Sequence, residues 1–475
     1  MPEETWHTAR LIPTSGISGA DEQERRAVSA LLAVISAVKE YGRAVLAPLG
    51  APNGALGCYI EVPFDLPDGR NVRPDGLIQV HRGQRTWTAL LEVKTGTNAL
   101  MADQLNDYLD IARDKGFDVL LTISNEIPPA PGVHPTTGID KRKLKKVALH
   151  HLSWSELLAA AQLQKEHRGV ADPDQAWILG ELIRYLEHPR SGALEFNDMG
   201  PAWVEVRNAV STGTLRPSDK SGPQVAGRFD ALLRYTALQL GRQLGTDVQV
   251  GLSRKELADP SLRANSLTAE LVNSGTMTGS LRIPNTAGSV TVIADLRANN
   301  VVCHLDVDAP KDGRPTTRVN WLLRQLKSAS DNVRLESTAA HSRGAGAAEL
   351  LSVVRADPTK LVLDATKELR SFRLAMTFPM GTKRGTGRGA FVDSVTEAVD
   401  VFYRDVVQGL KVWAPAAPRL RELPPEVPTS GFAAVLASTA LSSQDEDSEL
   451  ASVAEGSSES QATEYVPTTA SSGTM

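Results

Sequence analysis

Hydrophobic and polar positions follow a regular order over Arg73–Asn125. A short apolar run follows Asp75, a polar connection with a glycine interrupts it, and a second β-rich run covers Trp87–Val93. Apolar residues then recur at helical spacing as far as Gly116, which predicts a helix with a glycine cap. The nearly unbroken apolar run Phe117–Ile123 is typical of a strand buried on both faces. The stretch therefore predicts strand, hairpin, strand, helix and strand in succession.

The sequence on either side of this stretch predicts further elements. An apolar stripe over residues 21–41 is typical of an amphipathic helix, and Gly42 is expected to end it. We also expect strands at Tyr59–Phe64 and Val147–Trp154, a helix at Glu156–Glu166 capped by Ser155, and a helix at Asp174–Leu186 whose buried face includes Trp177.

Residues beyond 190 are organised differently. Their spacing predicts helices and the strands of an antiparallel sheet, which together make an α+β unit. The expected helices are Trp203–Ser211, Gly227–Leu244, Arg318–Ser328 and Phe391–Gly409, and the expected strands are Val248–Ser253, Thr276–Arg282, Ser289–Leu296, Val301–Val307 and Val333–Glu336.

The length of 475 residues exceeds one compact core, so we expect two domains and a tail. Residues 1–190 are expected to form an α/β domain with a mixed sheet flanked by helices. Residues 191–415 are expected to form a separate α+β domain. Residues 416–475, rich in Pro, Ser, Thr and Glu, hold too few apolar residues to offset chain entropy and are expected to be disordered.

Composition changes this picture only modestly. The net charge is −5, but Glu426–Met475 alone carries eight acids and no Lys or Arg, which leaves 51 basic and 48 acidic residues elsewhere. Cys58 and Cys303 lie far apart without nearby metal-ligand partners, which argues against a disulfide scaffold or a zinc site. The chain has no apolar run of membrane-spanning length and no signal-peptide pattern, so we expect a cytoplasmic protein with no membrane partner.

Three side chains in the first stretch have the spacing of a catalytic site. Glu92 and Lys94 are two apart on one strand, so both point to the same face, whereas Val93 points into a core. Asp75 begins the neighbouring strand, where a hairpin brings its carboxylate beside Glu92. Two adjacent carboxylates repel each other unless a cation lies between them. A hard divalent ion with oxygen ligands, most simply Mg²⁺, suits such a pair.

This arrangement resembles the PD-(D/E)xK nuclease superfamily, which has the restriction-endonuclease-like fold. The matching residues are Pro74-Asp75 and Glu92-Val93-Lys94, followed by Gln104 and Tyr108 on a helix. The resemblance covers residues 21–125, about a quarter of the chain. The order of strands and helices adds specificity to a motif that is short by itself.

The resemblance implies a role for each matching residue. Asp75 and Glu92 would bind Mg²⁺, or alternatively Mn²⁺, with the carbonyl of Val93 as a further oxygen ligand. Glu24, in the preceding helix, would add another acid, with Glu22 as the second choice.

The resemblance also implies two roles that do not involve binding the metal ion. Lys94 would position the attacking water, and Gln104 would orient Lys94 or a phosphate from the following helix. Tyr108 is expected to pack in the core.

Other segments have residues suited to nucleic acid. The Gly-rich loop Gly381–Gly389 carries Lys383, Arg384 and Arg388, which suit a phosphate backbone or, equally, a solvated loop. The loop lacks the ending of a P-loop, which excludes that class of NTP hydrolysis. Basic residues also lie in the segment Lys141–Lys146, where a solvated linker is the alternative to phosphate binding. Around one helix, at Arg314, Arg318, Arg324 and Lys327, we expect a solvent-exposed helix face, with contact to DNA as the alternative.

Neighbouring histidines occur at His150 and His151. Because neighbouring residues of a strand point to opposite faces, the two cannot chelate one metal together, and we assign them no catalytic role.

The sequence therefore predicts a Mg²⁺-dependent nuclease-like protein that hydrolyses phosphodiester bonds, in DNA rather than RNA, with a role in repair, restriction or phage defence. The alternative is a catalytically silent module, binding nucleic acid or protein, that retains the nuclease fold in a stress or regulatory protein. A homo-oligomer is open in either case, because nothing in the sequence selects an oligomeric state.

Overall fold

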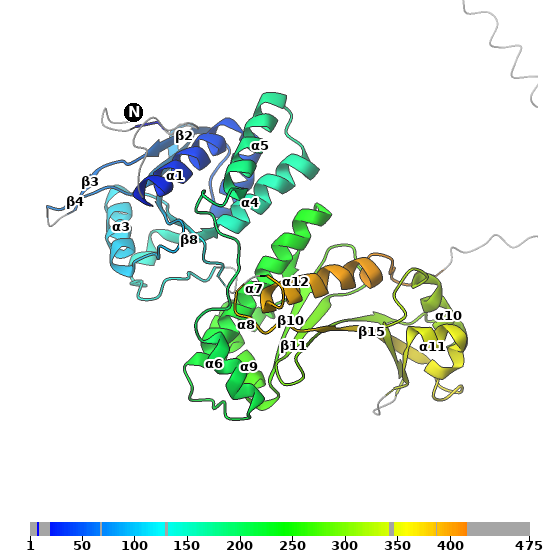
Figure 1. Cartoon of the computed structure of the whole chain (residues 1–475). Helices are drawn as coiled ribbons and strands as arrows, with labels where there is room; N and C mark the ends of the chain where they lie inside the picture. The colour runs from blue at the N-terminus through cyan, green and yellow to red at the C-terminus, as the bar shows by residue number, and fades with distance from the viewer. Residues whose placement is uncertain are drawn as a thin grey trace, which may run out of the picture. The chain divides into compact units, whose positions relative to one another are not determined.

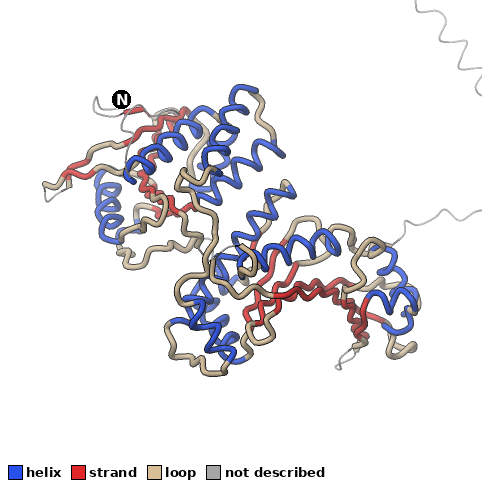
Figure 2. Tube along the Cα trace, in the orientation of Figure 1, coloured by secondary structure: helices blue, strands red, loops and turns tan. Residues whose placement is uncertain are grey.

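The structure is a computed structural model, and it describes residues 7–8, 20–66, 69–128, 132–341, 346–385 and 387–415. The tail expected to be disordered, residues 416–475, lies outside these ranges. The described chain is α/β, with a mixed sheet flanked by helices and a second, antiparallel sheet (Figures 1 and 2).

The first sheet has six strands in the order β1-β2-β5-β6-β7-β8. Strands β2, β5 and β6 pair antiparallel, whereas β6, β7 and β8 pair parallel. The bounds are β1 His7–Thr8, β2 Ala55–Ile60, β5 Gly76–Arg82, β6 Arg85–Val93, β7 Val119–Ser124 and β8 Ala148–Ser153, and a separate ribbon pairs β3 Phe64–Asp65 with β4 Asn71–Val72.

Helices cover both faces of this sheet, and the sheet separates two hydrophobic cores. One core lies under α1, α2, α4 and α5, and the other lies under α3. The bounds are α1 Ala20–Ala37, α2 Lys39–Leu46, α3 Ala102–Lys115, α4 Trp154–Gln162 and α5 Pro173–Glu187, with 3₁₀ turns at Ala47–Leu49 and Lys143–Lys145 and a π-helix at Leu163–Arg168.

The second sheet has seven antiparallel strands in the order β14-β13-β15-β12-β11-β10-β9. The strands are β9 Gln249–Val250, β10 Thr276–Arg282, β11 Val290–Asp295, β12 Asn300–Asp308, β13 Arg334–Ala339, β14 Ala348–Leu350 and β15 Leu369–Pro379. Buried and partly exposed residues alternate along its longer strands, so one face packs on a core and the other meets solvent.

Helices α7 and α12 pack on the core side of this sheet, and α9 packs beside α7 and β10. The helices are α6 Trp203–Ser211, α7 Ser221–Leu244, α8 Arg254–Ala258, α9 Pro260–Asn273, α10 Pro315–Gln325, α11 Leu351–Ala356 and α12 Phe391–Phe402, with a 3₁₀ turn at Pro358–Leu361 and a π-helix at Tyr403–Val407. The two cysteines are free and buried, Cys58 on β2 and Cys303 on β12, and burial raises the pKa of both thiols, that of Cys58 to about 12.

The central stretch forms the predicted elements in the predicted order, and Gly116 caps α3 with φ of 69°. The remaining elements need several corrections. The strand expected at Tyr59–Phe64 ends at Ile60, because Glu61 turns the backbone to φ of 51°. The helix α4 begins earlier than expected, and its cap is Ser153, which forms a reciprocal capping box with Glu156.

Several expectations about side-chain burial and secondary structure were wrong or incomplete. Trp177 is 61% exposed, because α5 buries only the stripe that includes Leu179, Leu182 and Leu186. Arg318 is buried at 4% exposure and donates to three carbonyls, so it is not on a wet face. The helices α8 and α9 were not expected, and the strand expected at Val248–Ser253 is only Gln249–Val250.

The helix expected over residues 21–41 is two helices. The backbone leaves helical geometry at Val38, with φ of −100° and ψ of 94°, and α2 then begins at Lys39. Gly42 does not end a helix but lies inside α2. A Cβ at this position would come within 2.3 Å of the Ile35 carbonyl oxygen, so glycine lets the two helices pack closely.

We therefore expect Gly42→Ala to destabilise the fold. Replacing a glycine inside a helix by alanine would by itself stabilise the fold by about 1 kcal/mol. The added methyl group, however, would clash with the Ile35 carbonyl, and overpacking of this kind destabilises a fold by about 1–3 kcal/mol. Urea unfolding should show a net loss of stability. Gly227→Ala is the matched control, since this glycine also lies inside a helix and a Cβ there would meet no atom within 4 Å. A stabilised Gly42→Ala protein would contradict this account of the helix crossing.

Candidate functional site

Asp75 and Glu92 face each other at the ends of two neighbouring strands. Gly76 pairs with Leu91 in the β5–β6 ladder, so the next step of the register sets Asp75 opposite Glu92. The backbone amide of Val93 donates to Asp75 Oδ2 at 2.7 Å and ties the carboxylate to β6. Both acids are on the sheet face that α3 covers, as the burial of Leu77 and Leu90 in that core shows.

Lys94 directs its ammonium into this acidic group. Its Nζ lies 2.7 Å from Glu92 Oε1 and 3.3 Å from Glu24 Oε2. The backbone of Lys94 is held on both sides, because its amide donates to the Ile123 carbonyl at 2.8 Å and its carbonyl accepts from Trp154 Nε1 at 2.9 Å. The side chain therefore leaves the strand end from a fixed point.

Glu24 reaches the same place from the first turns of α1. Asn98 Nδ2 donates to Glu24 Oε1 at 2.7 Å, and the Thr95 amide donates to the same oxygen at 3.4 Å. Glu22, the second choice from the sequence, is instead paired with Arg26 on its own helix. The structure therefore places Glu24, and not Glu22, in contact with Lys94.

Burial and like charge raise the proton affinity of this group. Burial, and then the neighbouring Glu92, hold the pKa of Asp75 well above its ordinary value. Burial also raises the pKa of Glu92, against the opposing pull of Lys94. Burial lowers the pKa of Lys94, but the charges of Glu92, Asp75 and Glu24 outweigh that effect and raise it overall. Three carboxyl groups thus share one ammonium.

The oxygens of Glu92 have an unusual environment. Glu92 is 1% exposed, and neither carboxylate oxygen meets hydrogen-bond geometry with any described residue. Its Oε1 lies in ion-pair contact with Lys94, and the side chains of Asp75 and Tyr108 also interact with the Glu92 carboxyl group. Buried carboxylates ordinarily have well-formed hydrogen bonds, so the poor geometry around Glu92 leaves its oxygens incompletely satisfied.

The residues at this site offer the right donor atoms for a metal ion, but their side chains are not arranged around one point. Carboxylate oxygens on Asp75 and Glu92 are the donors that Mg²⁺ prefers. As the side chains stand, no group of three or more His, Cys, Asp or Glu in the described ranges is arranged to hold a metal ion. The Lys94 ammonium contacts the carboxylates of both Glu92 and Glu24.

The remaining residues predicted for this site have other contacts. Gln104 Nε2 donates to the Tyr108 hydroxyl at 3.0 Å, and no described hydrogen bond joins Gln104 to Lys94. Tyr108 is buried against the core under α3, as expected, and burial followed by the charge of Glu92 raises its pKa. Val93 buries its side chain in the opposite core.

The described residues of the Gly-rich loop, 381–385 and 387–389, include three exposed cations, Lys383, Arg384 and Arg388. Lys383 Nζ donates to the Arg388 carbonyl at 2.8 Å, and Arg384 pairs with Asp198 at 3.1 Å. The carbonyl of Thr382 accepts hydrogen bonds from the Trp203 indole and the Arg207 guanidinium. None of the contacts described for Lys383, Arg384 and Arg388 goes to the acidic group.

A histidine pair adjoins the acidic group on the same sheet face. Thr122 is the register partner of Glu92 on one side and of His151 on the other. The Thr122 hydroxyl lies 2.8 Å from His134 Nε2 and 2.8 Å from His151 Nδ1. His151 thus pairs with a loop histidine that sequence reasoning missed, and not with His150.

Backbone groups at both ends fix the tautomers of this pair. The Thr136 amide donates to His134 Nδ1 at 3.1 Å, so the neutral ring carries its proton on Nε2 and donates to Thr122. The Thr122 hydroxyl then donates to His151 Nδ1, and His151 Nε2 donates to the Glu126 carbonyl at 2.9 Å. Burial lowers the pKa of both histidines to about 4, so both rings are neutral at pH 7.

Sequence reasoning also missed the residues that support the acidic group. Asn98, Thr95 and Trp154 hold Glu24 and Lys94 in place. Asn98 and Thr95 follow directly after the lysine of the motif, in the turn between β6 and α3, and that position is the signal that could have found them. Trp154 is 60 residues away from Lys94, and no local pattern connects the two.

Comparison with known proteins identifies no related protein. The chain matches no protein-family model, and it has no significant match among curated proteins or solved structures. None of the helices in the described ranges has the length and apolar content that a membrane crossing requires.

Neutralising Asp75 should stabilise the fold at neutral pH. The pKa of this group is higher in the folded than in the unfolded chain, so ionisation opposes folding increasingly as pH rises from the unfolded to the folded pKa. Asp75→Asn keeps an oxygen for the Val93 amide and removes the charge. Its urea midpoint should exceed that of the parent at pH 7 and approach it in acid. Asp114→Asn, on the exposed end of α3, should change neither. A less stable Asp75→Asn protein at pH 7 would contradict this.

The histidine pair should make stability depend on pH in the opposite sense. Because the pKa of each ring falls from 6.5 to about 4 on folding, the unfolded chain binds more protons between these values. The contribution of the neutral histidine pair to folding stability is therefore fully present above pH 6.5, and it is lost as pH falls towards 4. A double variant, His134→Gln with His151→Gln, should lose less stability over this range in urea titrations, whereas His188→Gln, at an exposed position, should behave like the parent.

Proposed function

We propose that the acidic group formed by Asp75, Glu92 and Lys94 is the catalytic site of a metal-dependent nuclease of the PD-(D/E)xK type, acting on DNA. The observation that supports this most is the convergence of two buried carboxyl groups and one ammonium at the ends of β5 and β6. Structural ion pairs ordinarily satisfy their oxygens, but neither oxygen of Glu92 meets hydrogen-bond geometry with a described residue.

Asp75 and Glu92 would hold the ion, with Glu24 and the Val93 carbonyl as further oxygen donors. A bound Mg²⁺ supplies Lewis acidity and lowers the pKa of a water molecule. An ion held there would relieve the repulsion between the two carboxylates, and Lys94 would position the attacking water and face the phosphate. Gln104 and Tyr108 line this face from α3.

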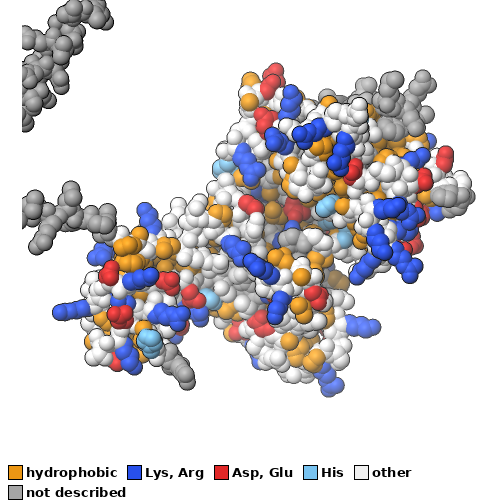
Figure 3. Space-filling view, turned by 180° about the vertical axis from the view of Figure 1, so that it is seen from behind, with side chains coloured by type: hydrophobic (Ala, Val, Ile, Leu, Met, Phe, Trp, Pro, Cys, Tyr) orange, Lys and Arg blue, Asp and Glu red, His pale blue; other side chains and the backbone are white. Residues whose placement is uncertain are grey.

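Exposed cations on the same sheet face as Asp75 and Glu92 support nucleic acid as the substrate. The segment around the 3₁₀ turn Lys143–Lys145 packs beside α3, and Lys141, Arg142, Lys145 and Lys146 in it are exposed. Figure 3 shows that the described Lys and Arg side chains on the face seen there lie in small groups separated by neutral, acidic and apolar ones. We infer that local groups of cations, such as the one in Lys141–Lys146, would hold the DNA.

A silent module is the second candidate, and one observation favours it. Lys94 already bridges Glu92 and Glu24, and the described acids are not arranged to hold a metal as they stand. In that case the ion pairs close the end of the sheet, and the protein binds nucleic acid or another protein without cleaving it.

Cleavage assays separate the two candidates. Plasmid and linear DNA are incubated with the full chain in Mg²⁺, Mn²⁺ or EDTA. We expect metal-dependent cleavage that falls by about 100-fold or more in Asp75→Asn, Glu92→Gln and Lys94→Gln, because each removes charge from the reacting centre. Lys115→Gln, at the exposed end of α3, is the matched control for loss of a cation. DNA binding that persists in all variants without cleavage by the parent would establish the silent module.

Metal binding has a readout that does not depend on activity. An ion that binds only the folded chain raises its unfolding temperature by mass action. Mg²⁺ should therefore raise the melting temperature of the parent and leave that of Asp75→Asn unchanged. Equal shifts in both proteins would place the ion elsewhere.

A further inference from the structure

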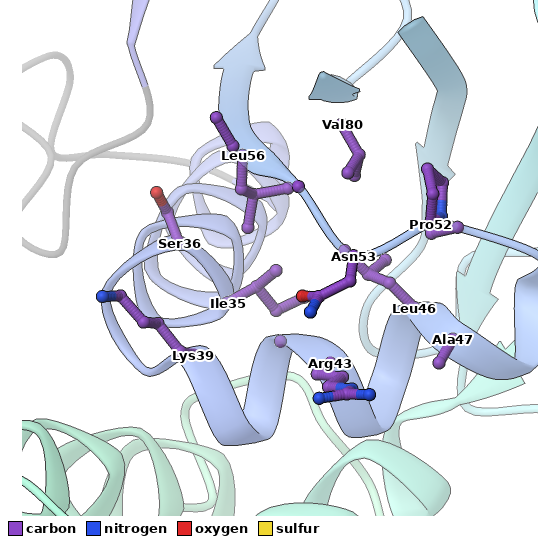
Figure 4. Close-up of a pocket in the computed structure, with 14 residues that line it drawn as sticks. Ile35, Ser36, Lys39, Arg43, Leu46, Ala47, Pro52, Asn53, Leu56 and Val80 are labelled. Atoms are coloured by element: carbon purple, nitrogen blue, oxygen red, sulfur yellow. The ribbon is translucent and has the colours of Figure 1, made fainter. Parts of the chain in front are cut away.

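A cavity lies at the opposite end of α1 from Glu24. It has a volume of about 410 Å³ and opens between the last turns of α1, helix α2 and the segment that leads into β2 (Figure 4). Aliphatic side chains form its floor, namely Ile35, Leu46, Leu56 and Val80. Its volume lies within the range of about 300–1,000 Å³ that is usual for small-molecule sites.

Two glycines bring the backbones around this cavity close together. A Cβ at Gly42 would lie 2.3 Å from the Ile35 carbonyl oxygen, and a Cβ at Gly54 would lie 2.2 Å from the His81 carbonyl oxygen. Both glycines line the cavity. The close crossing of α1 with α2, and of the β2 approach with β5, therefore frames the opening on two sides with backbone that has little room to move.

Cations and an amide, but no acid, line the opening. Lys39 and Arg43 are one turn apart on α2, and neither lies within ion-pair distance of a carboxylate on a described residue. Like charges at this spacing repel each other, so the pair is destabilising unless an anion lies near it. Asn53 reaches in from the other side, with its amide directed towards Ile35 (Figure 4).

We propose that this cavity binds a small amphipathic anion, whose aliphatic body lies on the apolar floor and whose carboxylate or phosphate head lies between Lys39 and Arg43. No aromatic side chain lines the cavity, so it offers no stacking platform for a nucleic-acid base. No acid lines it, so a cationic ligand would find no partner.

This ligand site is separate from the proposed nuclease site and does not depend on it. Eleven residues of α1 separate Glu24 from Ile35, which corresponds to about 16 Å along the helix axis. Ligand binding in the cavity can therefore be measured in variants whose nuclease-site residues have been substituted.

Calorimetric titration of the full chain tests the proposal. The probes are decanoate and decyl phosphate below their micellar concentrations, with decanol as the uncharged analogue and acetate and inorganic phosphate as heads without a body. Decanoate or decyl phosphate should bind at one site, decanol about tenfold or more weakly, and the two heads not measurably. Octanoate should bind about tenfold more weakly than decanoate, because each buried methylene contributes about 0.8 kcal/mol.

Variants locate the site. Lys39→Glu with Arg43→Glu should weaken binding of the anions by about tenfold or more and leave decanol unchanged. Leu56→Trp, which fills the cavity, should weaken all of the long-chain probes. Lys115→Glu with Lys255→Glu, two exposed cations that do not line the cavity, is the matched control and should bind like the parent. Circular dichroism and urea midpoints confirm that each variant is folded.

The results also decide between the two heads. Tighter binding of decanoate than of decyl phosphate identifies a carboxylate ligand, and the reverse identifies a phosphate. Equal binding of decanol and decanoate, or anion binding that survives the charge reversal in a folded variant, would overturn the proposal. Absence of binding by every long-chain probe to the parent would overturn it as well.

Discussion

The burial of three carboxyl groups around a single ammonium is the constraint on which this part of the molecule depends. Lys94 cannot neutralise Glu92, Glu24 and Asp75 together, and burial excludes the water that would otherwise screen them. The protein tolerates the imbalance because backbone amides and Asn98 hold the acids in place. Such an arrangement is costly in stability and is typical of sites where function, not folding, decides the residues.

The carboxyl ends of β6, β7 and β8 gather the polar groups of this face in one row. Three register partners lie side by side across these parallel strands, namely Glu92, Thr122 and His151. Glu92 belongs to the cluster of acids around Lys94, whereas His151 belongs to the neutral histidine pair. His134, in the segment after β7, is joined through Thr122 to His151, so this residue is tied to the sheet at the strand next to Glu92. Ligand sites in α/β sheets commonly lie at the carboxyl ends of parallel strands.

The parts that the sequence could predict are those governed by local periodicity. Period-2 alternation and a hairpin were sufficient to bring Asp75, Glu92 and Lys94 together. The break at Val38 could not be read in the same way, because the apolar stripe continues across it and glycine at 42 acts through a contact with another helix. Helix α9 was missed because its interior is mostly polar, although Asp259 and Pro260 supply a cap and a first-turn proline.

Contacts between segments far apart in the chain account for the rest. Trp154 supports Lys94, and His134 meets His151, through tertiary packing that no spacing rule encodes. The exposure of Trp177 has the same origin, since the neighbours of α5 decide which stripe is buried.

The two cysteines give each sheet its own reporter. Cys58 lies in the mixed sheet and Cys303 in the antiparallel one, and both thiols are inaccessible and kept protonated by burial. A thiol reagent can therefore modify either one only when its sheet opens, so labelling rates measure the opening of each sheet separately. Equal rates would mean that the two sheets unfold as one cooperative body, and unequal rates that they are independent folding units.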